Sequence, residues 1–128
     1  MKLIKPSAVP SQEPALTVVR LSNDADPQAL REQIHSVDRV ELLFPKFTDG
    51  RAFSQAYLLR RRLGFHGAIR ATGDVLIDQL LQMQRSGFSE AVLRADQDIE
   101  HAHQLLNQFS SFYQGDAVTT QPHFLKAA

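Results

Sequence analysis

The sequence predicts an α/β protein, a single small domain of four strand–helix units around a parallel sheet. Short apolar runs alternate along the chain with longer segments whose apolar residues recur at helical spacing. A strand–helix unit is also repeated, because residues 62–75 align with residues 85–99 once one residue is inserted. Right-handed crossovers place the strands of such units in parallel. We therefore expect either an open, flavodoxin-like sheet or a half-barrel-like one.

The predicted strands are short and apolar. The first is rich in β-branched residues, and the second ends at Pro45, which cannot donate a hydrogen bond to a neighbouring strand. The third is bracketed by turn residues. Because the connections leave little room for an antiparallel return, all four strands are expected to run parallel. They are predicted over residues 16–21, 38–44, 68–71 and 90–94.

The predicted helices have recognisable ends. Asp26 and Pro27 supply an N-cap and a first-position proline, and Asp49 is the candidate N-cap of the next helix. Gly64 and Gly87 each follow a helix, where a left-handed conformation favours glycine. Helices are predicted over about residues 27–35, 50–63 and 74–86, with a last one starting at Asp96 or Asp98 and including Phe109 and Phe112.

The two ends of the chain look different from its middle. Residues 1–15 carry three prolines and little periodic hydrophobicity, which predicts an extended N-terminal arm. The α/β domain is assigned to residues 16–114, and residues 115–128 are predicted to form a flexible C-terminal tail. A half-barrel-like sheet would leave an uncovered face, so a homodimer is one expected assembly.

Composition argues against several classes of function. Fourteen basic residues balance fourteen acidic ones, so net charge gives no reason to expect a nucleic-acid partner. The absence of cysteine excludes thiol nucleophiles and Fe–S ligation, and the histidines lack metal-ligand or catalytic-triad spacing. We therefore expect no metal and no cofactor. No apolar stretch approaches the roughly 20 residues that span a bilayer, and no signal-peptide pattern is present, so a cytoplasmic protein without membrane contact is expected.

Charged residues gather in the segments that follow the second, third and fourth predicted strands. The carboxyl ends of parallel strands share one edge of the sheet, where α/β proteins place their ligand-contacting loops. Four cations there could bind a small oxyanion or an acidic partner, with two glycines allowing close approach. The candidates at this loop edge are Lys46, Asp49, Gly50, Arg51, Arg70, Thr72, Gly73, Asp74, Arg94 and Asp96.

The same residues also have a structural interpretation. The three carboxylates are candidate helix caps, and arginines can pair with them across neighbouring loops. The glycines fit ordinary tight turns, since no nucleotide-binding glycine motif is present. The run Arg60–Arg62 is interpreted as a solvated helix end, where the helix dipole favours positive charge. Both interpretations of the loop edge remain open at this point.

Several segments keep a long continuous spacing: residues 44–51 (FPKFTDGR), 58–60 (LLR), 64–65 (GF), 70–76 (RATGDVL), 78–80 (DQL) and 85–88 (RSGF). With them the chain resembles the bacterial domain-of-unknown-function family 934 over roughly residues 16–114. The resemblance implies a role in sulfur assimilation, because members are commonly encoded beside the haemoprotein of assimilatory sulfite reductase, and some carry an oxidoreductase label. It also implies a signature formed by Lys46, Asp49, Gly50, Arg51, Arg70, Gly73, Asp74, Asp78 and Gln79.

Ser86 stands where many relatives have a cysteine, so the resemblance brings no thiol mechanism to this chain. The leading hypothesis is a non-catalytic accessory protein of assimilatory sulfite reduction, which binds the reductase haemoprotein or its electron donor through the loop edge around Lys46, Arg51 and Arg70. The alternative is an enzyme or sensor that binds a sulfur oxyanion or a phosphate-bearing ligand there, with Asp49 or Asp74 as general base. The hypotheses differ on whether the protein is an enzyme, and no catalytic residue is assigned.

Overall fold

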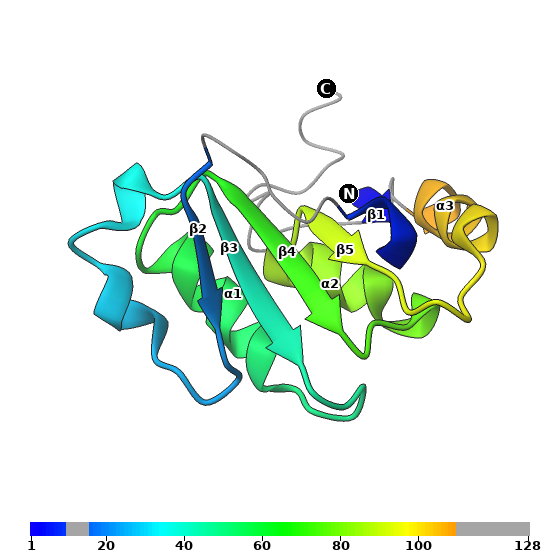
Figure 1. Cartoon of the computed structure of the whole chain (residues 1–128), viewed down its shortest axis with the longest axis horizontal. Coiled ribbons are helices and arrows are strands. Elements are labelled where there is room, and N and C mark those ends of the chain that lie inside the picture. Colours follow the sequence, from blue (N-terminus) through cyan, green and yellow to red (C-terminus); the bar gives the residue numbers. More distant parts are fainter. Residues whose placement is uncertain (10–15, 110–128) are drawn as a thin grey trace, which may run out of the picture.

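The computed structural model describes residues 1–9 and 16–109. Five strands form one sheet in the order β1-β5-β4-β3-β2, and every neighbouring pair is parallel (Figure 1). The predicted α/β class and parallel sheet are therefore confirmed. The strands are β1 (Lys2–Ile4), β2 (Val18–Leu21), β3 (Arg39–Phe44), β4 (Ala68–Gly73) and β5 (Glu90–Val92). The helices are α1 (Arg51–Arg61), α2 (Leu80–Ser86) and α3 (Ile99–Phe109), with short 3₁₀ helices η1 (Pro6–Ala8), η2 (Pro27–Leu30), η3 (Ile34–Ser36) and η4 (Ile77–Gln79).

The strand β1 is not predicted from the sequence, which places its residues in an extended arm. Three residues are too few to show a pattern. They become a strand by pairing in register with β5, far along the chain, with Lys2 opposite Glu90 and Ile4 opposite Val92. The non-sequential neighbours β1 and β5 thus form one end of the sheet. Within the described residues, no helix has the length and apolar character needed to cross a membrane.

Two predicted helices differ from the structure. The helix over residues 27–35 is wrong, because that segment forms the separate turns η2 and η3. Asp26 does cap the first turn by accepting the Gln28 N–H (3.0 Å), but so short a segment forms a regular helix only through extensive packing. The helix α2 begins at Leu80 and not near Asp74, because the Asp74 carboxylate bonds to neighbouring loops and does not cap a helix.

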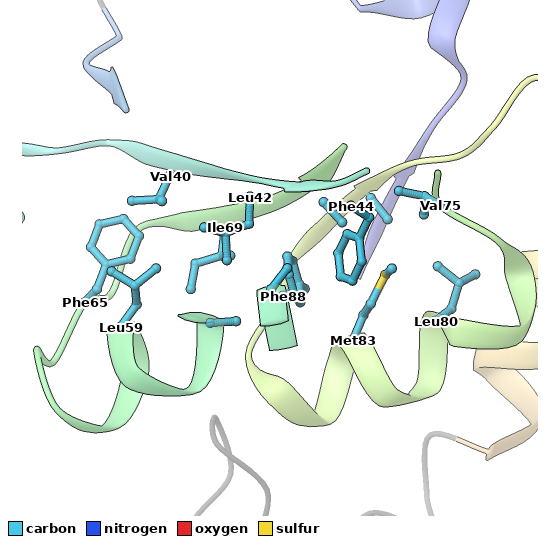
Figure 2. Packing of buried hydrophobic residues seen from close by; sticks show 14 of the residues in the cluster. Val40, Leu42, Phe44, Leu59, Phe65, Ile69, Val75, Leu80, Met83 and Phe88 are labelled. Atoms are coloured by element: carbon cyan, nitrogen blue, oxygen red, sulfur yellow. The ribbon is translucent and has the colours of Figure 1, made fainter. Parts of the chain in front are cut away.

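The core lies between the sheet and helices α1 and α2 (Figure 2). Alternate residues of β3 point toward these helices, so Val40, Leu42 and Phe44 are fully buried. The Phe44 ring packs edge-on against Phe53 of α1 (5.1 Å between ring centroids) and also contacts Phe88 (5.7 Å). This packing fixes the carboxyl end of β3 directly before the first loop of the candidate site.

The other face of the sheet carries a row of alternating charges, here called the charged row. Arg70 lies opposite Glu90 on one side, with Nε and Oε1 2.7 Å apart, and opposite Glu41 on the other. Arg39, Glu41 and Arg70 are buried. One charged residue from each strand is in register, in the order Lys2, Glu90, Arg70, Glu41 and Arg20. Ion pairs therefore link β2 to β3, β3 to β4 and β4 to β5 on this face.

Arg60 is not part of a solvated helix end, so that interpretation is wrong for this residue. Its half-buried guanidinium donates to the backbone carbonyls of Phe65 (2.9 Å), Gly67 (2.7 Å) and Gly87 (2.9 Å). Burial lowers the pKa of Arg60. Arg60 thus ties the end of α1 to the loops that lead into β4 and β5, while the two arginines that follow it are exposed.

Candidate functional site

The first loop of the candidate site follows β3 and leads into α1. Asp49 forms an ion pair with Arg51 (Oδ2 to Nη2, 2.9 Å) and accepts the Arg51 backbone N–H (3.0 Å). The hydrogen bond from the Arg51 side chain is the main reason that the pKa of Asp49 falls to about 2. Asn23, in the loop after β2, donates its side-chain amide to the same carboxylate (2.6 Å). Gly50 is the N-cap of α1 and no side chain caps this helix, so the predicted N-cap role of Asp49 is wrong. The Asp49 carboxylate instead joins the loops after β2 and β3.

Asp74 joins three further segments of the loop edge. Its Oδ2 accepts a hydrogen bond from the backbone N–H of Phe47, in the loop after β3 (2.8 Å). Its Oδ1 accepts a hydrogen bond from Nη1 of Arg94, in the loop after β5 (2.7 Å). Its own backbone N–H donates to the Phe44 carbonyl (2.8 Å). The Arg94 hydrogen bond is the main cause of a lowered pKa at Asp74. One carboxylate thus cross-links the loops after β3, β4 and β5.

Arg94 is held by a second carboxylate as well. The Asp96 carboxylate accepts hydrogen bonds from Nε and Nη2 of Arg94, both at 2.7 Å, which makes the ion pair bidentate. Asp96, followed by Asp74, raises the pKa of Arg94, and the same pairing lowers the pKa of Asp96. The guanidinium is occupied on all three nitrogens, so Arg94 offers little uncompensated charge to an added oxyanion.

Phe47 is exposed on this cross-linked edge. Its backbone is fixed at the N–H by Asp74 and at the carbonyl by the side-chain amide of Gln79. Its side chain nevertheless stays outside the core, and the residue is 47% exposed. Lys46, the preceding residue, is also exposed and forms no ion pair with any residue of the described ranges. Aromatic residues, Phe among them, are enriched at protein interfaces relative to the rest of the surface.

Arg70 does not lie at the loop edge. The third strand is predicted to end at residue 71, one residue after Arg70, but β4 continues to Gly73 and leaves Arg70 three residues before the end of the strand. The residue is 5% exposed and belongs to the charged row, where Nη1 also lies 3.9 Å from Glu41. The expectation that four cations converge at the loop edge is therefore wrong for Arg70. Thr72 likewise lies in β4, with its hydroxyl 3.4 Å from the Leu42 carbonyl oxygen.

The two glycines of the candidate site differ in their structural roles. Gly73 has φ of +94°, and a Cβ there would lie 2.4 Å from the Phe44 carbonyl oxygen. Glycine is therefore needed where β4 turns into its loop. Gly50 has φ of −91°, and a Cβ there would meet nothing within 4 Å. Gly50 leaves open space beside the start of α1.

The arrangement suits binding better than proton transfer. The carboxylates of Asp49, Asp74 and Asp96 have lowered pKa values because arginines pair with them, which makes them weak general bases. In the part of the chain that the structure describes, no group of three or more His, Cys, Asp or Glu residues could hold a metal ion. The loop edge is a cross-linked surface with Lys46 and Phe47 exposed on it.

Phe47 is not among the site residues predicted from the sequence. Its sequence signals are its place in the loop after a buried strand and its position in the segment 44–51 that carries the family resemblance. Nothing in such a loop distinguishes an exposed aromatic from one that folds back into the core.

Comparison with protein families gives a match over most of the chain. The family described as "Bacterial protein of unknown function (DUF934)" matches residues 18–124. No curated protein matches the chain. The matched range contains the whole loop edge and four of the five strands, β1 being outside it.

Proposed function

We propose that this chain, which belongs to the bacterial protein family of unknown function DUF934, is a non-catalytic accessory protein of assimilatory sulfite reduction. It acts by binding the reductase haemoprotein or its electron donor through the loop edge. The proposed role in sulfur assimilation is supported by the family resemblance given above, because members of that family are commonly encoded beside the reductase haemoprotein. The binding role is supported by the geometry of the loop edge.

The exposure of Phe47 on a fixed loop is the observation that carries this proposal. Two hydrogen bonds, from Asp74 and Gln79, hold the backbone of Phe47. An aromatic side chain on an already ordered loop gains contact area in a complex at a small cost in conformational entropy. Aromatic residues of this kind often dominate the binding energy of protein interfaces. The adjacent Lys46 supplies a charge suited to the rim of such a contact.

The catalytic alternative has less support from the same residues. An oxyanion site needs cations whose charge is available, but Arg51 and Arg94 each pair with a carboxylate at 2.9 Å or less. A general base at neutral pH works best with a pKa near 7, whereas the pKa of Asp49 is lowered to about 2. The loop edge therefore favours partner binding over the chemistry of a bound anion.

Co-purification tests the proposal. Tagged protein is expected to retain the sulfite reductase haemoprotein or its electron donor from cells that assimilate sulfite. The variant Phe47→Ala should lose most of this retention, about tenfold or more, because a hot-spot aromatic contributes about 2 kcal/mol or more. Tyr57→Ala is the matched control, since Tyr57 is also an aromatic residue with 47% exposure but lies on α1, outside the loop edge.

Retention by both variants at the level of the native protein would contradict the role of Phe47. Failure of the native protein to retain either redox partner, under conditions where both are present, would contradict the proposed function itself. Circular dichroism of both variants should match the native protein, because neither side chain is buried.

A further inference from the structure

A cavity of about 530 Å³ lies at the carboxyl ends of β1 and β5, the two non-sequential neighbours in the sheet. Its walls come from the chain after β1, the chain after β5 and the first turn of α3, which lies beside β1 in Figure 1. Open α/β sheets bind ligands outside the carboxyl ends of their strands. The cavity has the position and size of a small-molecule site.

The charged groups that line this cavity are of two kinds. Arg94 and Asp98 already have partners: Arg94 pairs with Asp74 and Asp96, and the Asp98 carboxylate accepts the backbone N–H of Glu100 (3.0 Å). Lys5 and Glu100 have side chains with no ion pair or hydrogen bond to any residue of the described ranges. One positive and one negative residue, both exposed to solvent and neither paired with a side chain of the described ranges, therefore line the same cavity from two different elements.

Apolar side chains complete the lining. Leu93 is buried at the end of β5, and Ile99 at the start of α3 is half-buried. Ser7, on the same wall as Lys5, is the residue of this lining that carries a neutral hydroxyl. A ligand that matches these groups has a carboxylate for Lys5, an ammonium for Glu100 and an apolar part for Leu93 and Ile99.

We propose that this cavity binds a zwitterionic ligand of the α-amino acid class, with an apolar side chain. Each charge of such a ligand meets an oppositely charged group that pairs with no side chain of the described ranges, and charge-assisted hydrogen bonds are the stronger kind. A singly charged ligand would leave either Lys5 or Glu100 unmatched. This site is independent of partner binding by Phe47 at the loop edge.

Thermal unfolding of the full chain with three probes tests the proposal. L-leucine carries both charges, isopentylamine carries only the ammonium, and 4-methylpentanoate carries only the carboxylate. Stabilisation grows with ligand concentration over Kd, so millimolar L-leucine is expected to raise Tm by several degrees, and each singly charged analogue to raise it far less. In calorimetric titrations, Lys5→Ala and Glu100→Gln should each weaken L-leucine binding about tenfold or more.

Matched controls are Lys2→Ala and Glu32→Gln, which remove exposed charges outside the cavity lining and should leave L-leucine binding unchanged. Absence of any Tm shift with L-leucine would overturn the proposal. So would stabilisation by 4-methylpentanoate alone that survives Glu100→Gln, because that result describes a simple anion site. Neither outcome bears on the retention of a redox partner through Phe47.

Discussion

Replacing Arg70 with alanine is expected to lower the free energy of unfolding by roughly 3–5 kcal/mol, the usual cost of removing one member of a buried ion pair. Arg70 is 5% exposed, and its Nε lies 2.7 Å from Glu90. The substitution leaves Glu90, whose side chain is only 17% exposed, without this guanidinium partner. It also removes one of the charges facing Glu41. Urea denaturation of the variant and the native protein measures the difference.

Arg20→Ala is the control for this experiment. Arg20 belongs to the same charged row and pairs with Glu41 at 3.0 Å, but its side chain is 75% exposed. Glu41 is buried but keeps Arg39 (3.0 Å) and Arg70 (3.9 Å) as partners after this substitution, so the free energy of unfolding should change far less than in Arg70→Ala. Equal and small effects of both substitutions would contradict the structural role of Arg70 and reopen a functional one.

Phe44→Ala is expected to be comparably destabilising, by about 3–5 kcal/mol, because it removes a large side chain from a closed core. Phe44 is fully buried, and its ring contacts those of Phe53 and Phe88. Neither neighbour can fill the space without leaving its own contacts, so a cavity would remain. Chemical denaturation monitored by circular dichroism measures this loss.

Phe47→Ala is the matched control in the same strand–loop segment, three residues further along the chain. Its exposed side chain should contribute less than about 0.5 kcal/mol to stability. A destabilisation similar to that of Phe44→Ala would contradict the exposed position of Phe47. It would also remove the basis for treating Phe47 as a contact residue.

Much of the sheet is predictable because its signals are local. The strand β3 ends before Pro45, and α1 is followed by Gly64 with φ of +65°, so apolar runs and turn residues place both elements within a few residues. The strand β1 is different. Its three residues become a strand only through pairing with β5, a contact that no local pattern records.

The candidate site was predictable only in part, for a related reason. Asp49 with Arg51, and Arg94 with Asp96, lie two positions apart in sequence and pair within their own loops. The structural interpretation expects pairs across neighbouring loops, and Arg94 with Asp74 is a pair of that kind. Arg70 lies away from the loop edge because β4 continues two residues beyond its predicted end, and its side chain is on the face opposite α1 and α2. The cross-links made by Asp74 depend on three loops meeting in space, which sequence spacing does not encode.

Growth of a deletion strain with sulfite as its sulfur source tests whether the loop edge serves sulfite reduction through a contact made by Phe47. We expect the deletion to impair this growth. The native protein and Tyr57→Ala should restore growth and Phe47→Ala should not, although all three proteins accumulate in a folded form. Full restoration by Phe47→Ala would contradict the role of Phe47, and undiminished growth of the deletion strain would contradict a role in sulfite reduction.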